Sequence, residues 1–198
     1  KLVSAVVEQD SVVLWDLKTM AFIKKWKTDH NVIEAMEFSK CSKYIATSGQ
    51  DRNVKLWKIL EYANSSVSLW EATDSIDNLK FSTDGYLVAG CRDGMIKVWE
   101  LPEKLIWEFE GYGWGKQSLA FIDNSKFLAF KDKNESVQIW DITKNLRVGY
   151  IKIPNEKIEA ICSSSDGKYL AIGGSKKKLY IQNVESIYNL LKKNVFEI

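Results

Sequence analysis

The sequence has few of the residues on which enzyme and metal sites depend. It contains one histidine, His30, and three cysteines that stand far apart, Cys41, Cys91 and Cys162. An odd number of cysteines without paired spacing favours a reducing compartment, the cytoplasm or the nucleus, and predicts no structural zinc. No Gly-rich phosphate loop opens a helix. We therefore expect no catalytic site, cofactor or metal site.

Arginine is also scarce, which bears on nucleic-acid binding. The 198 residues include 28 of Lys or Arg, yet only three are arginines, and the formal net charge is +2. Because arginine is the usual residue for bidentate phosphate recognition, a dedicated nucleic-acid surface is not favoured. No run approaches 18 apolar residues, so no membrane span is predicted. The 45% of hydrophobic residues suffices for a sizeable core.

What the sequence does contain is a repeat. Short β-branched runs end at four tryptophans, Trp15, Trp57, Trp99 and Trp140. The intervals are 42, 42 and 41 residues, and a fifth copy ends 42 residues later at Gln182. An aromatic residue precedes three of these positions by 18 or 19 residues, at Phe38, Phe81 and Phe121, and Ser163 holds that place in the last copy. A fixed period of this length is typical of repeat architectures.

Each repeat predicts an all-β unit. Its apolar runs are four to seven residues long and rich in Val, Ile, Tyr, Phe and Trp, which favours strands over helices. Asp84-Gly85 and Asp166-Gly167 lie between two such runs and indicate tight hairpin turns. One unit thus holds about four antiparallel strands. Because a single sheet is marginal alone, radial stacking into a β-propeller is expected.

The expected strands fall into five groups. They are 2–7, 11–16 and 20–26; 32–38, 44–48, 53–58 and 66–72; 76–81, 86–91, 95–100 and 104–109; 117–122, 126–131, 136–141 and 146–152; and 158–163, 169–173 and 178–184. The first group lacks an innermost strand. In the tail 185–198, Ile187, Leu190 and Leu191 have helical spacing, whereas KNVFEI resembles the earlier outer strands; we favour a strand there, with a helical turn before it as an option.

The unit resembles a WD repeat over essentially the whole chain. The dipeptide that names this family stands at Trp15-Asp16 and Trp140-Asp141. The resemblance implies a buried hydrogen-bond network in the most complete copy, residues 29–58, formed by His30, Thr47, Asp51 and Trp57. The next copies keep Asp93 with Trp99, and Trp140 with Asn134 at the aspartate position. The last copy has Lys176 and Gln182 at these places, so no such network is expected there.

The place of His30 in this network also argues against a catalytic role for the only histidine. His30 could serve a catalytic site with a nearby acid and hydroxyl, but its place in the repeat favours a structural role. Two carboxylate pairs, Asp29 with Glu34 and Asp132 with Glu135, lie in or near loops. We expect them to be solvated turn residues.

The expected domain organisation is one propeller region, residues 1–198, with units at 1–28, 29–73, 74–110, 111–153 and 154–198. Five units are fewer than the seven most common in the family. An open propeller would expose sheet faces and edges. We expect further blades upstream to complete the ring, with other chains as the alternative.

Two loops are candidates for partner binding. In the segment GYGWG, Tyr112 and Trp114 stand where similar proteins usually carry Gly-His, and either bind a partner or pack over the blade. The run Lys176, Lys177 and Lys178 either meets an acidic partner or is solvated. On the outer strands, Trp26, Trp70 and Trp107 are expected to pack between neighbouring blades.

Two functions from different classes follow. The first is a non-catalytic scaffold that binds other proteins in a larger assembly, with no small-molecule substrate. The alternative is a nucleic-acid-associated propeller in an RNA-processing or ribonucleoprotein particle. The repeat architecture and the scarcity of catalytic residues favour the scaffold.

Overall fold

The computed structural model describes residues 3–8, 10–59, 66–111 and 119–191. The strands, in chain order, are β1 Val3–Glu8, β2 Ser11–Asp16, β3 Ala21–Lys27, β4 Ile33–Phe38, β5 Tyr44–Gly49, β6 Asn53–Lys58, β7 Ser66–Glu71, β8 Ile76–Phe81, β9 Tyr86–Cys91, β10 Met95–Glu100, β11 Lys104–Glu110, β12 Leu119–Ile122, β13 Phe127–Lys131, β14 Ser136–Asp141, β15 Leu146–Lys152, β16 Ile158–Ser163, β17 Tyr169–Gly174 and β18 Leu179–Asn183, and the helix α1 is Val184–Leu191.

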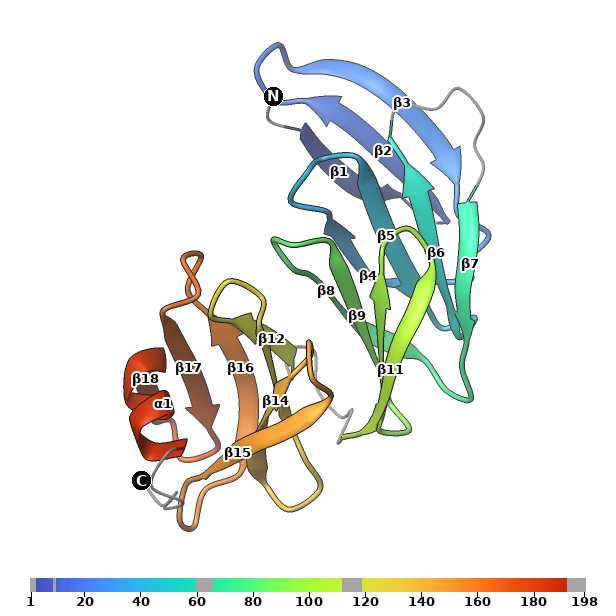
Figure 1. Cartoon of the computed structure of the whole chain (residues 1–198). Coiled ribbons are helices and arrows are strands. Elements are labelled where there is room, and N and C mark those ends of the chain that lie inside the picture. The colour runs from blue at the N-terminus through green and yellow to red at the C-terminus, as the bar shows by residue number, and fades with distance from the viewer. Residues whose placement is uncertain (1–2, 9, 60–65, 112–118, 192–198) are drawn as a thin grey trace.

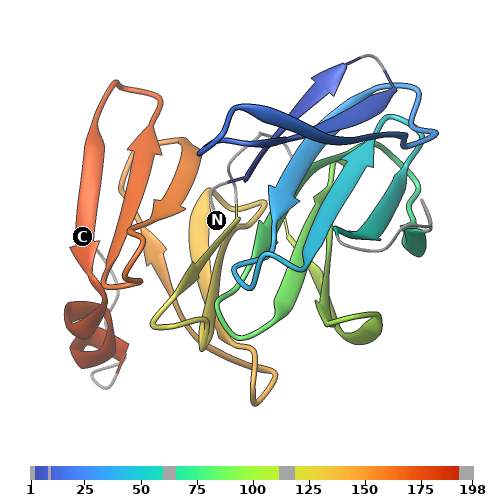
Figure 2. The same cartoon turned by 90° about the horizontal axis from the view of Figure 1, so that it is seen from above.

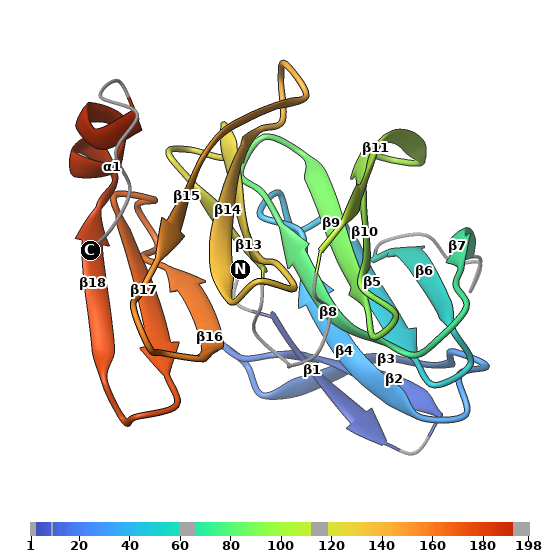
Figure 3. The ribbon, with the colours of Figure 1, turned by 90° about the horizontal axis from the view of Figure 1, so that it is seen from below.

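The strands form five antiparallel sheets, which we call blades 1 to 5. Blade 1 is β1–β3, blade 2 is β4–β7, blade 3 is β8–β11, blade 4 is β12–β15 and blade 5 is β16–β18. Each strand pairs with its neighbour in the sequence, and the blades follow one another in chain order (Figures 1 and 3). The prediction of an all-β fold built from four-stranded antiparallel propeller blades is confirmed.

The hydrophobic core is divided among the spaces between blades. One cluster joins blades 1 and 2, a second joins blades 2 and 3, a third joins blades 3 and 4, and a fourth joins blades 4 and 5. The inner strands β4, β8, β12 and β16 of neighbouring blades contact one another (Figure 2). Packing on both faces explains why second strands such as β9 and β13 are buried almost throughout.

Alternation along a strand assigns its side chains to two different cores. In β13, Phe127 and Ala129 belong to the cluster shared with blade 5. Leu128 and Phe130 belong to the cluster shared with blade 3. Successive side chains point to opposite faces of a sheet, so one strand contributes to both of its interfaces.

Aromatic pairs connect the outer strand of one blade to the next blade. The ring centroids of Trp26 and Trp57 lie 6.0 Å apart, and those of Trp70 and Trp99 also lie 6.0 Å apart. Such a pair adds about 0.5–1.5 kcal/mol beyond the burial of its surface. Trp26 and Trp70 are buried between blades, as predicted.

The third outer tryptophan behaves differently. Trp107 is half-buried, and its Nε1–H donates to the carbonyl oxygen of Ile142 in blade 4 at 2.6 Å. Phe109 replaces it as the ring that packs on blade 4, with its centroid 4.7 Å from that of Trp140. Both residues still join blade 3 to blade 4, as expected for this strand.

Polar side chains also link adjacent blades. The Ser48 hydroxyl donates to the carbonyl oxygen of Ile76 at 2.8 Å, and the Lys131 ammonium donates to that of Ile158 at 2.7 Å. Ser48 and Lys131 hold the same place in their blades, at the end of the second strand, and both acceptors open the next inner strand. A serine and a lysine thus make the same connection in two interfaces.

The tail after β18 begins with a helix. Val184 and Ile187 of α1 are buried in the cluster between blades 4 and 5, and α1 lies beside blade 5 (Figure 1). The helical spacing noted in the sequence thus corresponds to residues 184–191. The predicted strand at KNVFEI, residues 193–198, lies outside the described residues.

Candidate functional site

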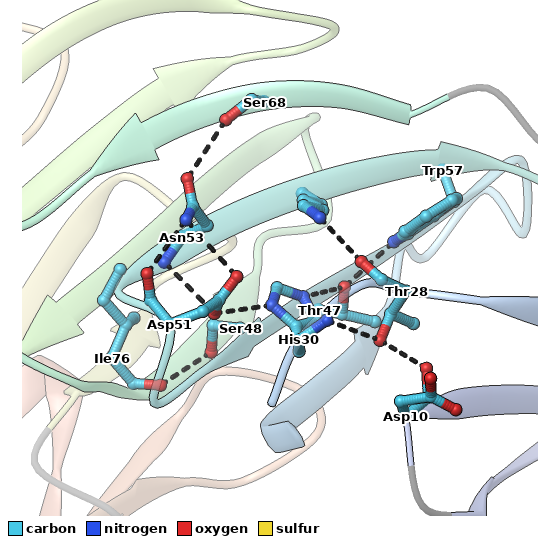
Figure 4. A network of polar contacts seen from close by, with 11 residues as sticks. Asp10, Thr28, His30, Thr47, Ser48, Asp51, Asn53, Trp57, Ser68 and Ile76 are labelled. Atoms are coloured by element: carbon cyan, nitrogen blue, oxygen red, sulfur yellow. Dashed lines mark hydrogen bonds and ion pairs between the residues drawn. The ribbon is translucent and has the colours of Figure 1, made fainter. Parts of the chain in front are cut away.

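Four side chains of blade 2 form a continuous hydrogen-bond chain (Figure 4). The Nε1–H of Trp57 donates to the Thr47 hydroxyl oxygen at 2.9 Å. Thr47 Oγ1 lies 2.8 Å from Nε2 of His30, and Nδ1 of His30 lies 2.7 Å from Oδ1 of Asp51. The chain joins the loop before β4 to β5, to β6 and to the β5–β6 turn.

The donor and acceptor roles along this series of hydrogen bonds follow from a neutral imidazole at His30. With its hydrogen on Nδ1, His30 donates to Asp51 and accepts the Thr47 hydroxyl hydrogen at Nε2, so each donor meets an acceptor. Burial lowers the pKa of His30, although the hydrogen bond to Asp51 and its charge act in the opposite direction. The side chain of His30 is completely buried, and both ring nitrogens are used. The arrangement therefore supports the fold and leaves no ring nitrogen for a substrate.

Further bonds tie this chain to blade 1. The backbone N–H of His30 donates to Thr28 Oγ1 at 3.3 Å, and that hydroxyl donates to the carbonyl oxygen of Asp10 at 2.8 Å (Figure 4). The ammonium of Lys55 donates to the carbonyl oxygen of Thr28 at 2.7 Å. Blade 2 thus fixes the connection that leads into it.

In blade 3 a threonine takes the histidine's role. The Thr73 hydroxyl donates to the Asp93 carboxylate, which also accepts the backbone N–H of Met95. Burial acts to raise the pKa of Asp93, but these hydrogen bonds outweigh it and the pKa is lowered. Trp99 is buried, whereas Ala89 supplies no hydroxyl to a network.

In blade 4 the carboxylate comes from a different position than expected. Asp132, rather than Asn134, accepts the backbone N–H groups of Asn134 and Ser136, the Ser136 hydroxyl and the Gln138 amide. The interpretation of Asp132 as a solvated turn residue was wrong, because it is only 9% exposed. Its four donors lower its pKa against the raising effect of burial. A carboxylate two residues before the predicted position, at Asp132 instead of Asn134, can thus accept the hydrogen bonds of this turn.

Blade 5, where the sequence predicts no network of this kind, contains a different set of hydrogen bonds. The Glu156 carboxylate accepts the Lys176 backbone N–H at 2.6 Å, which lowers its pKa, and also the hydroxyls of Ser175 and Tyr180. Glu156 precedes β16 as His30 precedes β4. A Cβ at Gly174 would lie 2.5 Å from the Cγ of Glu156, so the glycine makes room for it. An acceptor thus occupies the histidine's place.

The candidate partner-binding residues fall into two groups. Tyr112 and Trp114 lie outside the described residues. Lys176, Lys177 and Lys178 are exposed in the β17–β18 turn, and Lys177 has a φ of 59°. The structure does not bring these lysines to another candidate residue within its described part.

The described residues contain neither a cluster of metal-binding side chains nor a membrane-spanning helix. Among residues 3–8, 10–59, 66–111 and 119–191, no group of three or more His, Cys, Asp or Glu side chains is arranged to hold a metal ion. No helix in the same ranges is long and apolar enough to cross a membrane.

Comparison with known proteins identifies the repeat in part of the chain. The model of the family "WD domain, G-beta repeat" matches residues 22–58 and 64–100. The chain contains WD repeats within these two ranges. The two matches end one residue beyond Trp57 and Trp99, at the close of the third strands β6 and β10.

Several curated proteins are similar over much of the chain. Pre-mRNA-processing factor 19 of Oryza sativa subsp. japonica is 25% identical over 83% of this chain and 32% of its own length. Autophagy-related protein 16 of Arabidopsis thaliana is 22% identical over 100% of this chain and 40% of its own. Target of rapamycin complex subunit wat1 of Schizosaccharomyces pombe is 25% identical over 70% and 45%. The chain thus spans less than half the length of each.

Proposed function

We propose that this WD-repeat chain is a non-catalytic scaffold that binds other proteins as a subunit of a larger assembly. The observation that carries the proposal is the structural use of His30, the only histidine, whose two ring nitrogens are both held by Thr47 and Asp51. The stacked blades instead present turns on their rims, as at Lys176 to Lys178. The relative wat1 supports the proposal, because its name describes a complex subunit.

The proposal has several parts. The chain is not an enzyme, takes no small-molecule substrate and works inside the cell, in the cytoplasm or the nucleus. Its five units, 1–28, 29–73, 74–110, 111–153 and 154–198, act together as one propeller region. All three cysteines are free, which suits a reducing compartment. The partner-binding candidates are Tyr112, Trp114 and the three lysines of the β17–β18 turn.

Co-purification of the intact protein from its own cells tests this function. We expect defined polypeptides to elute with it in fixed ratios. Replacing Lys176, Lys177 and Lys178 by Glu should weaken at least one of these contacts, while the same change at three exposed lysines elsewhere, Lys18, Lys144 and Lys152, should not. A protein that elutes alone as a monomer under all extraction conditions would refute the scaffold.

A second function is favoured by one specific observation, the similarity to a pre-mRNA-processing factor. A nucleic-acid-associated propeller would use its lysines on phosphates, so RNA binding would weaken steeply as salt rises. A titration of RNA binding between low and physiological salt separates the two functions. Absence of binding, or binding without salt dependence, would exclude the second.

A further inference from the structure

Within the described residues, blade 5 lacks the outer strand that the other blades carry. In blades 1 to 4, the chain turns after the strand that ends near the repeat tryptophan and returns along it as β3, β7, β11 or β15. After β18 it enters α1 directly at Val184, and Asn183 Oδ1 accepts the Glu185 backbone N–H at 2.8 Å (Figure 3). β18 is therefore the edge of its sheet.

The backbone of this edge offers hydrogen-bonding groups. The Gly174 N–H donates to the Lys178 carbonyl oxygen at 3.0 Å, so residue 178 bonds to β17. In an antiparallel pair, alternate residues bond to the neighbouring strand. Leu179 and Ile181 therefore direct their N–H and C=O groups away from β17. In the described ranges no strand pairs with that side of β18, and neither residue has a hydrogen bond there.

The edge also lacks the features that protect the other outer strands. β3, β7, β11 and β15 each carry at least one charged side chain, and each pairs with its neighbour through a register shift. β18, with the sequence LYIQN, has no charged side chain, and its pairing with β17 has no such shift. Charges and bulges are the usual protection of an edge against a further strand. A regular, uncharged edge suits strand addition.

Two apolar side chains lie along the same edge. Leu179 and Ile181 are 66% and 62% exposed. They alternate with Tyr180, so they lie on one face of the sheet. Directly opposite side chains on paired strands lie within contact distance of each other. An added strand would therefore contact both residues, and apolar or β-branched side chains fit these two places.

One end of the edge is basic. The three lysines of the β17–β18 turn, Lys176 to Lys178, directly precede β18. The Ser175 N–H donates to the Lys157 carbonyl oxygen at 2.9 Å, which brings a fourth lysine to this turn. Among the described residues, none of the four lysines forms an ion pair within 4.0 Å.

The neighbouring carboxylates do not cancel this charge. Glu135 accepts the Ile158 backbone N–H, but it is compensated by its ion pair with Lys131 at 3.0 Å. Glu156 and Glu159 remain, and two carboxylates against four lysines leave a charge of +2. An acidic group at this end of the edge would thus meet donors that carry uncompensated charge.

The edge and the charge together select the occupant. Residues 192–198 of the chain contain two lysines and one glutamate, so they match the basic end poorly. The outer strands of the other four blades are all antiparallel to the strand beside them. Resting on the scaffold function proposed above, we propose that β18 binds an extended segment of a partner protein as an antiparallel outer strand, with acidic residues at the segment's C-terminal end.

Titration of the full-length, 15N-labelled protein with synthetic peptides tests the edge. Acetyl-Thr-Val-Thr-Val-Thr-Glu-Glu-Glu-amide should shift the amide signals of residues 179, 181 and 183, and the same peptide with lysines in place of the glutamates should not. Ile181→Pro removes an N–H at the open edge and none that faces β17, so it should weaken binding about ten-fold or more. Ile181→Val keeps this N–H and is the matched control, which should bind like the parent.

A charge reversal gives a second readout that does not depend on the proline. Replacing Lys176, Lys177 and Lys178 by Glu should invert the preference, so that the variant binds the lysine peptide better than the glutamate peptide. Equal binding of both peptides by the parent, no shift with either, or an Ile181→Pro variant that binds like the parent would overturn the proposal.

Two further measurements separate the alternatives. If a variant without residues 192–198 binds the glutamate peptide and the parent does not, the chain's own tail occupies the edge and the partner strand is rejected. In co-purification from cells, Ile181→Pro should release a partner that Ile181→Val retains. If the assembly stays intact with Ile181→Pro, the strand proposal fails while the scaffold stands; if no assembly forms with the parent, the scaffold fails and the peptide titration still decides the edge.

Discussion

The Thr47 hydroxyl offers a sharp test of the hydrogen-bond chain in blade 2. Thr47→Val replaces the hydroxyl by a methyl group of similar shape and leaves two buried polar groups without partners, Nε1–H of Trp57 and Nε2 of His30. The three residues are 0%, 4% and 1% exposed in the order Thr47, Trp57, His30, so water cannot replace the lost bonds.

Each unpaired group costs about 1–3 kcal/mol. Because His30 keeps its bond to Asp51, we expect Thr47→Val to lower the free energy of unfolding by about 3 kcal/mol. For a chain of this size, that corresponds to a fall of roughly 6–12 °C in the melting temperature.

Urea unfolding followed by tryptophan fluorescence and circular dichroism measures the change. Thr47→Ser keeps the hydroxyl and should cost clearly less than Thr47→Val. Thr19→Val, at an exposed turn position, is the control and should stay within about 0.5 kcal/mol of the parent. If Thr47→Val also stays within that range at an unchanged m value, the hydroxyl is not the link between Trp57 and His30.

Three further predictions concern titration, the turn carboxylate and the thiols. Since the pKa of folded His30 lies below its ordinary value of 6.5, the unfolded chain binds the proton more readily, so stability should be complete above pH 6.5 and fall as the pH decreases below it; urea midpoints that rise on acidification would contradict this. Asp132→Asn should cost about 2 kcal/mol, because an amide cannot accept all four donors, and an unchanged melting curve would refute the role of Asp132. Burial raises the pKa of Cys91 to about 11, whereas bonds from Ser39 and Lys43 and the charge of Lys43 lower that of Cys41 against the effect of its desolvation. Iodoacetamide should therefore label the exposed Cys41 before the buried Cys91 at neutral pH, and mass spectrometry that found Cys91 labelled before Cys41 would contradict this.

Much of the fold could be predicted because the same pattern of strands and turns recurs in each repeat of the sequence. Val, Ile and aromatic runs separated by Asp-Gly turns fixed the strand boundaries closely; Gly85 and Gly167 have φ angles of 92° and 69°, which suits those turns. The tail was harder to predict. Its apolar residues fit both a helix and an outer strand, and burial of Val184 and Ile187 against two blades, a long-range effect, is what distinguishes residues 184–191.

The candidate site residues were likewise predictable only where a copy keeps the residue types of the repeat. His30, Thr47, Asp51 and Trp57 lie where the repeat pattern placed them, since that copy keeps all four residue types. The roles of the Asp132 and Glu156 carboxylates were missed. The repeat spacing places the acidic residue at a constant distance before the tryptophan of the third strand, whereas the turns of blades 4 and 5 take their carboxylates from other positions. The sequence does hold a signal for Glu156, since it lies two residues before β16, much as His30 lies three residues before β4.

The alternation in β13 has a consequence for how substitutions combine. Leu128 and Ala129 are adjacent in the chain but belong to different interfaces, whereas Leu128 shares its interface with Val98, thirty residues earlier. Residues in contact show non-additive effects, and separated ones add. Thermodynamic coupling should therefore be weak between immediate neighbours and strong at distances near one repeat, so that a map of pairwise couplings would show bands parallel to its diagonal.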